Sequence, residues 1–217
     1  MAQRHLRHED YAVGWVCALP VELAAAQEML DEEDYGPPSD SNDPNSYTLG
    51  RIGEHNVVIA CLPAGQTGIA SAAAVALRMK SKFQSIRFGL MVGVGGGVPD
   101  TDVRLGDVVV SQPCKEHGGV VQYDFGKSTP DGFERIGSLN LPPEVLLTAL
   151  STLQSNYFRQ RKKLSQYLSP LVEKLPDFSR KKAGPDVLFL ANYDHVGGNT
   201  YEQCRKDKQV QRTLREN

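Results

Sequence analysis

Short apolar runs separated by turn residues recur through the first half of the chain, and such runs are typical of buried strands. They predict strands at 11–19, 88–92 and 108–110, and a hairpin formed by 46–51 and 56–62. Two other stretches are rich in alanine and other helix-forming residues, which predicts helices at 21–30 and 69–83. Pro20 suits the first turn of the earlier helix.

The second half of the chain has a less regular pattern. It predicts strands at 120–125 and 186–190, a helix at 142–158 and a turn at 193–198. Residues 156–183 carry a basic run, which we interpret as a solvated helical insertion rather than a binding patch. Residues 31–44 are acidic and rich in turn residues, and predict a surface loop. Residues 1–10 predict a loose leader, and no repeat or linker divides 1–217, so one domain is expected.

Four glycines in five positions, 93–97, follow the apolar run at 88–92. A backbone almost free of side chains lets a ligand approach its N–H groups closely. The dinucleotide-binding pattern G-x-G-x-x-G is not met, because Val98 stands at its last position and Pro99 follows. No Gly-Lys-Ser/Thr follows either, so a phosphate loop of that type is excluded. A plain turn between strands remains an alternative.

Glu22 stands where a predicted strand meets the start of a predicted helix. In open α/β sheets, ligands bind at that edge. A carboxylate in a first helical turn also stabilises the helix dipole, so a purely structural role stays open. Thr67 and Gly68 start the next helix, whose first amides suit an anion or a hydroxyl, or are simply capped. His117 and Asp124 are further candidates for a polar site.

Composition limits the function classes. A net charge of −2 and a pI near 6.2 argue against a nucleic-acid-binding protein. The sequence has no apolar run long enough for a transmembrane helix and no apolar signal core. Four cysteines without C-x-x-C spacing fit a reducing, cytoplasmic location, with Cys17 and Cys61 as small core residues. No metal site is indicated.

Four motifs in order resemble the nucleoside phosphorylase and nucleosidase superfamily. They are ALPVE at 18–22, TGIASAAA at 67–74, VGVGGGV at 92–98 and LGDVVVS at 105–111. GGVVQYDFGK at 118–127 and YDHVGG at 193–198 extend the resemblance to the nucleoside phosphorylase-like domains at the N-termini of fungal multidomain receptor-type proteins. It runs from about Tyr11 to the end of the chain, and the order of the motifs makes it specific.

The resemblance implies a single α/β domain with a mixed, barrel-like central sheet flanked by helices in three layers. It implies cleavage of the N-glycosidic bond of a nucleoside or adenine nucleotide, with no cofactor. Members of the superfamily use either water or phosphate as the attacking group, so phosphate is a co-substrate only in a phosphorylase. Superfamily members are often oligomers, which leads us to expect a homo-oligomer.

By resemblance, Glu22 orients or activates the attacking water. Thr67, Gly68, Val94, Gly95 and Gly96 would lie around the ribose or the nucleophile. The superfamily often has Ser or Thr where this chain has Val94, which has no hydroxyl and can offer only backbone contacts.

The Gly-Asp-Pro stretch and following Arg of the phosphate-binding branch are absent, which favours hydrolysis. No Met-Glu-Ala motif and no later acidic residue in the expected setting occur either, so we expect a domain truncated at the C-terminus, with weakened catalysis. A phosphorylase and a non-catalytic nucleoside-binding or signalling module remain alternatives.

Overall fold

The computed structural model describes residues 6–35, 42–98, 101–159, 164–198 and 200–212. They divide into two compact units, one formed by Met1–Val103 with Tyr167–Asn217 and the other by Arg104–Gln166. The first unit holds the larger sheet, and the second holds a hairpin and a long helix. That the whole chain forms one incomplete domain stays a prediction.

The first unit is built on a mixed five-stranded sheet in the order β2-β3-β4-β1-β5. Strand β1 lies between β4 and β5 and is parallel to both, while β2–β3 and β3–β4 are antiparallel. The α/β class is therefore confirmed. In the described residues the sheet is open, with β2 and β5 as its edges, and it does not close into a barrel. The strands are β1 Val13–Cys17, β2 Glu32–Asp34, β3 Tyr47–Ile52, β4 His55–Cys61 and β5 Phe88–Met91.

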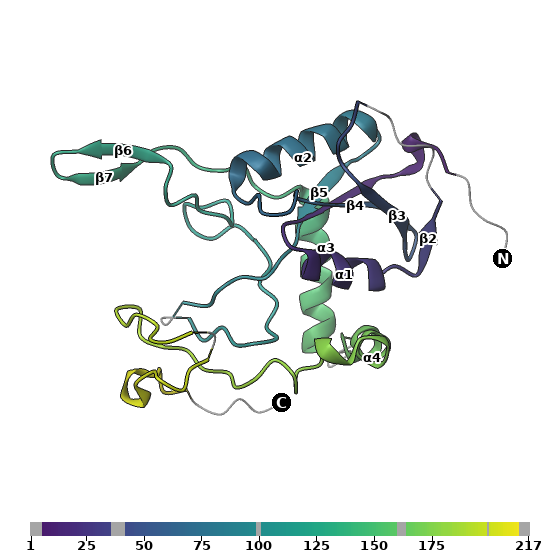
Figure 1. The fold of residues 1–217 in the computed structure, drawn as a ribbon. Helices are drawn as coiled ribbons and strands as arrows, with labels where there is room; N and C mark the ends of the chain where they lie inside the picture. Colours follow the sequence, from purple (N-terminus) through teal and green to yellow (C-terminus); the bar gives the residue numbers. More distant parts are fainter. Residues whose placement is uncertain (1–5, 36–41, 99–100, 160–163, 199, 213–217) are drawn as a thin grey trace. The chain divides into compact units, whose positions relative to one another are not determined.

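Helices α1 (Pro20–Glu28) and α2 (Ile69–Lys82) cover opposite faces of this sheet, as Figure 1 shows. Successive residues of β4 point to opposite faces, as in any strand. Ile59 packs in one apolar cluster with Ala26 of α1. Val58 packs in a second cluster with Val75 of α2. Burial on both faces explains why β4 is a continuous apolar run rather than an alternating one.

Helix α2 lies close to β1, and Gly14 makes this approach possible. A Cβ atom at Gly14 would lie 2.9 Å from the sulfur of Met79, closer than real Cβ atoms come to a neighbour. A glycine inside a strand often marks such an approach. The short 3₁₀ helix His8–Asp10 precedes β1, and Leu6 packs against the same cluster as Met79. The described part of the leader is therefore attached to the core.

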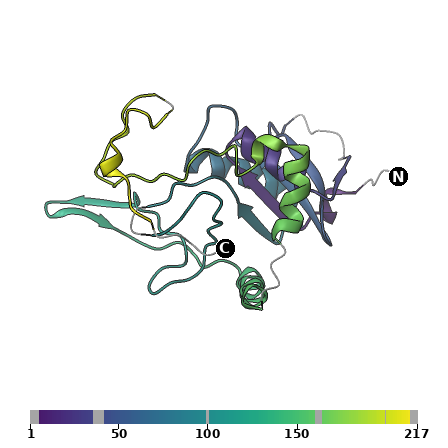
Figure 2. The same cartoon turned by 90° about the horizontal axis from the view of Figure 1, so that it is seen from below.

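The second unit contains the antiparallel hairpin of β6 (Gly126–Thr129) and β7 (Gly132–Arg135), seen from below in Figure 2. It also contains α3 (Glu144–Phe158), in which no residue is buried.

Helix α4 (Leu164–Lys174) begins at the end of the second unit, and most of it belongs to the first. The first unit also holds two 3₁₀ turns, Pro176–Phe178 and Lys206–Lys208. No described helix combines the length and apolar character that a bilayer crossing requires.

Three of the predicted strands are wrong. Residues 108–110 and 120–125 form no strand, and 186–190 contributes only the isolated bridge between Phe189 and Gln209. The three valines of 108–110 are 50–76% exposed. A β-branched run becomes a strand only where a neighbouring strand accepts its hydrogen bonds, and propensity alone does not supply one.

The other elements agree with the sequence pattern within a few residues. The first strand, the hairpin of β3 and β4, β5 and the helices α1, α2 and α3 are confirmed. Strand β2 lies inside the predicted acidic loop, where no apolar run indicated a strand. Of the predicted basic insertion, 160–163 lies outside the described residues, and most of the remainder is the end of α3 and α4.

We expect Phe83→Ala to lower the free energy of unfolding by about 3–5 kcal/mol, the usual cost of truncating a buried phenylalanine. Phe83 is 1% exposed, and its ring makes edge contacts with His8, Tyr11 and Tyr47 at 5.0–5.6 Å between centroids. Denaturant unfolding measures the change. Leu77→Ala in α2 is the control, because Leu77 is 70% exposed and its loss should change stability little. Equal effects of the two variants would contradict this description of the core.

Candidate active site

The candidate residues follow the carboxyl ends of three neighbouring parallel strands. Glu22 comes after β1, Thr67 and Gly68 come after β4, and Val94 to Gly96 come after β5. Because β1 is parallel to both neighbours, these three ends meet at one edge of the sheet. Ligands of open α/β sheets bind in crevices at this edge. The topology therefore brings together three loops that lie up to about seventy residues apart in the sequence.

The carboxylate of Glu22 joins two of these segments through backbone hydrogen bonds. The N–H groups of Ala18 and Leu19 donate to Glu22 Oε2 at 2.7 and 2.9 Å. The N–H of Val94 donates to Glu22 Oε1 at 2.8 Å. Glu22 is the third residue of α1, a position from which a glutamate side chain can reach back to the amides before the helix. It therefore caps α1 and holds the glycine-rich loop at once.

These contacts set the charge of Glu22. Partial desolvation is the largest influence and acts to raise its pKa, but the N–H groups of Val94, Leu19 and Ala18 together outweigh it and lower the pKa below the usual value. Hydrogen bonds donated to a carboxylate favour its charged form. Glu22 is thus an ionised carboxylate at neutral pH. A carboxylate has about four lone-pair sites, so Oε1, which accepts one bond here, retains a direction in which it can accept another.

The glycine-rich loop approaches Glu22 where a side chain would prevent it. A Cβ atom at Gly93 would lie 2.6 Å from Glu22 Oε1. The side chain of Val94 is 75% exposed, so its contribution is its backbone N–H. Gly95 and Gly96 face open space, with no atom within 4 Å of an added Cβ. Their backbone is accessible to a ligand, and Pro99 and Asp100 lie outside the described residues.

Thr67 and Gly68 are at the same edge but are not tied to Glu22. Gly68 is the residue before α2 and has a φ of 93°, a backbone conformation that L side chains rarely adopt. Both residues are exposed. Within the described part of the chain they make no hydrogen bond to Glu22 or to Val94, so the structure joins only two of the three predicted segments directly.

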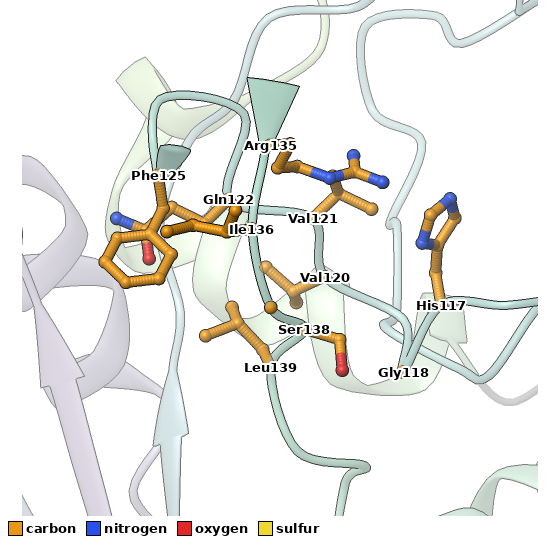
Figure 3. A pocket seen from close by; sticks show the side chains of 11 residues that line it. His117, Gly118, Val120, Val121, Gln122, Phe125, Arg135, Ile136, Ser138 and Leu139 are labelled. Atoms are coloured by element: carbon orange, nitrogen blue, oxygen red, sulfur yellow. The ribbon is translucent and has the colours of Figure 1, made fainter. Parts of the chain in front are cut away.

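Glu22 lines neither of two pockets that described residues form. One of about 350 Å³ lies beside the same sheet edge and is lined in part by Leu23 and Gln27 of α1, Thr48, and Cys61 at the end of β4. The other, of about 200 Å³, belongs to the second unit. Its apolar lining includes Val120, Val121, Ile136 and Leu139, with His117 and Arg135 as its basic members (Figure 3). Of the two candidates for a polar site, His117 lines this pocket and Asp124 does not.

Residues 12–166 match the family described as the Phosphorylase superfamily. A curated protein of the fungus Hyaloscypha variabilis, described as a "Nucleotide-binding leucine-rich repeat (NLR)-like protein", is 52% identical over 154 residues. The match covers 69% of this chain and 15% of that relative, so the chain corresponds to a small part of the relative's length. No solved structure matches the chain significantly.

The first unit has an α/β fold in which the loops after three parallel strands meet at one edge of the sheet. The family match covers more than half of the residues, and the chain belongs to the Phosphorylase superfamily. Its resemblance to domains of fungal receptor-type proteins is confirmed by the fungal relative.

We expect Gly93→Ala to raise the pKa of Glu22 toward its ordinary value. The added methyl would occupy the position of the carboxylate and separate it from the Val94 N–H, removing a hydrogen bond that favours the charged form. An NMR titration of the Glu22 side-chain carboxyl carbon measures this. Gly95→Ala is the matched control, because nothing lies within 4 Å of its added Cβ. An unchanged Glu22 pKa in Gly93→Ala would show that the loop does not hold the carboxylate.

Glu22→Gln should change how stability depends on pH. A carboxylate whose pKa is lowered by folding contributes stability that is fully present above its unfolded pKa, about 4.3, and is lost as pH falls through the folded pKa. The difference in unfolding free energy between wild type and Glu22→Gln should therefore be largest near neutral pH and shrink below about pH 4. Urea unfolding across this range measures it, and a pH-independent difference would contradict the assigned pKa direction.

Proposed function

We propose that this domain hydrolyses the N-glycosidic bond of a nucleoside or adenine nucleotide, with Glu22 orienting the attacking water. The observation that carries the proposal is the ionised Glu22 carboxylate, held at the ligand-binding edge by three backbone N–H groups with one acceptor direction left on Oε1. Membership of the Phosphorylase superfamily supports nucleoside processing in general.

The chemistry suits a carboxylate in this setting. Hydrolysis adds the hydroxyl of water to the anomeric carbon of ribose and its hydrogen to the departing base. Glycosidic cleavage passes through an oxocarbenium-like state, which carries positive charge on the sugar. A fixed negative charge near the sugar stabilises that state without reorganising during the reaction. In this proposal Oε1 of Glu22 accepts a hydrogen bond from the water and directs its lone pair toward the sugar.

The low pKa of Glu22 defines its role further. A general base works best when its pKa lies near the operating pH, and the three N–H donors move Glu22 away from that range. Glu22 therefore acts by orientation and by charge, and proton removal follows once the positive sugar has formed. The open backbone of Gly95 and Gly96 is where we place the ribose or the attacking water.

Two alternatives remain. Phosphate as the attacking group would make the protein a phosphorylase, since the superfamily includes such enzymes. A nucleoside-binding module without turnover is the second alternative: the open backbone of Gly95 and Gly96 would bind the nucleoside, and Glu22 would serve only to cap α1 and hold the loop. A homo-oligomeric state and a cytoplasmic location are carried over as further proposals.

We expect free base to be released from at least one of adenosine, inosine and ATP in the absence of phosphate, as followed by chromatography. Glu22→Gln should lower kcat by about 10²–10³-fold, the range typical of losing one preorganised electrostatic group. Glu54→Gln is the control, because Glu54 is exposed in the turn before β4, at the opposite end of that strand from the candidate site.

The outcomes separate the three functions. Base release that requires phosphate indicates a phosphorylase. Nucleoside binding by calorimetry, with no base released and affinity unchanged in Glu22→Ala, indicates a binding module. If Glu22→Gln hydrolyses nucleosides as fast as the wild type, the domain is a hydrolase but Glu22 has no part in the reaction.

A further inference from the structure

Two cysteines, separated by more than forty residues in sequence, are direct neighbours at the site edge of the sheet. Cys17 ends β1 and Cys61 ends β4, and they are paired in the parallel register of these strands. Neighbouring strands lie about 4.8 Å apart, which is inside the range of Cα separations, about 4.4–6.8 Å, that disulfides adopt. The Cys17 thiol donates to the carbonyl oxygen of Ala60, the residue next to Cys61, at 3.5 Å.

Both side chains lie on the same face of the sheet. Val57 and Ile59 of β4 and Val13 and Trp15 of β1 belong to the cluster beneath α1. Side chains separated by two residues in a strand share a face, so Cys61 and Cys17 continue these two rows on the α1 side. Two paired residues on one face have Cβ atoms that project side by side from the sheet, about 4.5–5.5 Å apart. A disulfide needs about 3.5–4.5 Å, so the ends of the two strands must draw slightly together to form it.

The two thiols differ in access. Cys17 is 1% exposed, whereas Cys61 is partly exposed and lines the cavity of about 350 Å³ beside α1. Burial, the neighbouring Cys61 and the charge of Glu22 together raise the pKa of the Cys17 thiol to about 12. Cys17 is therefore protected from direct oxidation, and a small oxidant entering the cavity meets Cys61 first.

We propose that Cys17 and Cys61 form a redox-active modification site, in which a hydroperoxide oxidises Cys61 and Cys17 then closes a reversible disulfide between β1 and β4. In the first step the Cys61 thiolate attacks one peroxide oxygen, giving a sulfenic acid and, from hydrogen peroxide, hydroxide. In the second step the Cys17 sulfur attacks the sulfenic sulfur, and water leaves with the sulfenic oxygen and the Cys17 proton. The peroxide is reduced and both thiols are oxidised.

The two cysteines lie next to the loops that carry the candidate site residues. The disulfide would fix the ends of the two strands from which the loops to Glu22 and to Thr67 begin. Ala18, whose N–H holds Glu22, is the next residue after Cys17. The inference rests on the sheet register and on the different exposure of the two thiols, and it stands whether or not the domain cleaves nucleosides.

The test uses the full chain with Cys114→Ser and Cys204→Ser, which leaves Cys17 and Cys61 as its cysteines. After treatment of the native protein with hydrogen peroxide, we expect both alkylatable thiols to be lost and the intact mass to fall by two hydrogens. A dithiol reductant should restore both. Peptide mapping without reduction should recover a cross-linked species that contains Cys17 and Cys61.

Single variants test the order of the two steps. Cys17→Ala should leave Cys61 as a sulfenic acid that a carbon-acid reagent traps, while Cys61→Ala should keep Cys17 reduced under the same treatment. The proposal is overturned if both thiols stay alkylatable when the exposed Cys114 of the wild-type chain is fully oxidised. It is equally overturned if the linkage forms only in denaturant, or if Cys61 in the two-cysteine protein proceeds to sulfinic acid with no disulfide.

Discussion

The parallel pairing of β1 with both β4 and β5 is the constraint on which the rest of the structure depends. It makes three strands end at one edge of the sheet, so that three loops distant in sequence become neighbours. It also requires a connection that crosses the sheet after β4, and α2 supplies that connection. Glycine at position 14 allows this helix to lie directly on β1. Without this pairing, Glu22 would have no loop beside it.

Sequence pattern predicted the elements that are buried and failed for those that are not. Strand β4 was recognisable because Val57 to Ala60 are buried on both faces, and its apolar run shows it. The valines of 108–110 have the same composition but stay exposed, because strand formation requires a partner strand, which composition does not encode. Conversely, β2 was not predicted, because its residues Glu32 to Asp34 are all acidic. Backbone pairing with β3, and not burial, holds them in a strand.

The candidate site was predictable in location but not in detail. The junction of strand and helix indicated Glu22, and the glycines indicated the loop that it meets. The contact itself depends on the N–H of Val94. Every residue except proline has such a donor, so the residue type does not predict which N–H reaches Glu22. The pairing of Cys17 with Cys61 was likewise invisible, because it depends on the register of two strands. Both were predicted to be small core residues, which is confirmed for Cys17, whereas Cys61 is only partly buried.

The two roles of Glu22 that the sequence presented as alternatives are compatible in the structure. Its carboxylate completes the first turn of α1, and the same group faces the glycine loop. A residue that stabilises a helix in this way is held in one orientation, which is what a ligand-directing group requires. The structural role therefore does not compete with a chemical one.

The bond between Val94 and Glu22 has one more consequence. In the free protein, a donor and an acceptor that both face the site satisfy each other. A ribose hydroxyl is a donor and an acceptor at once, so it can insert between them, giving its hydrogen to the carboxylate and taking the amide hydrogen on its oxygen. Under the proposed function, sugar binding would then be an exchange of hydrogen-bond partners, in which the Glu22 carboxylate and the Val94 N–H each keep a hydrogen bond.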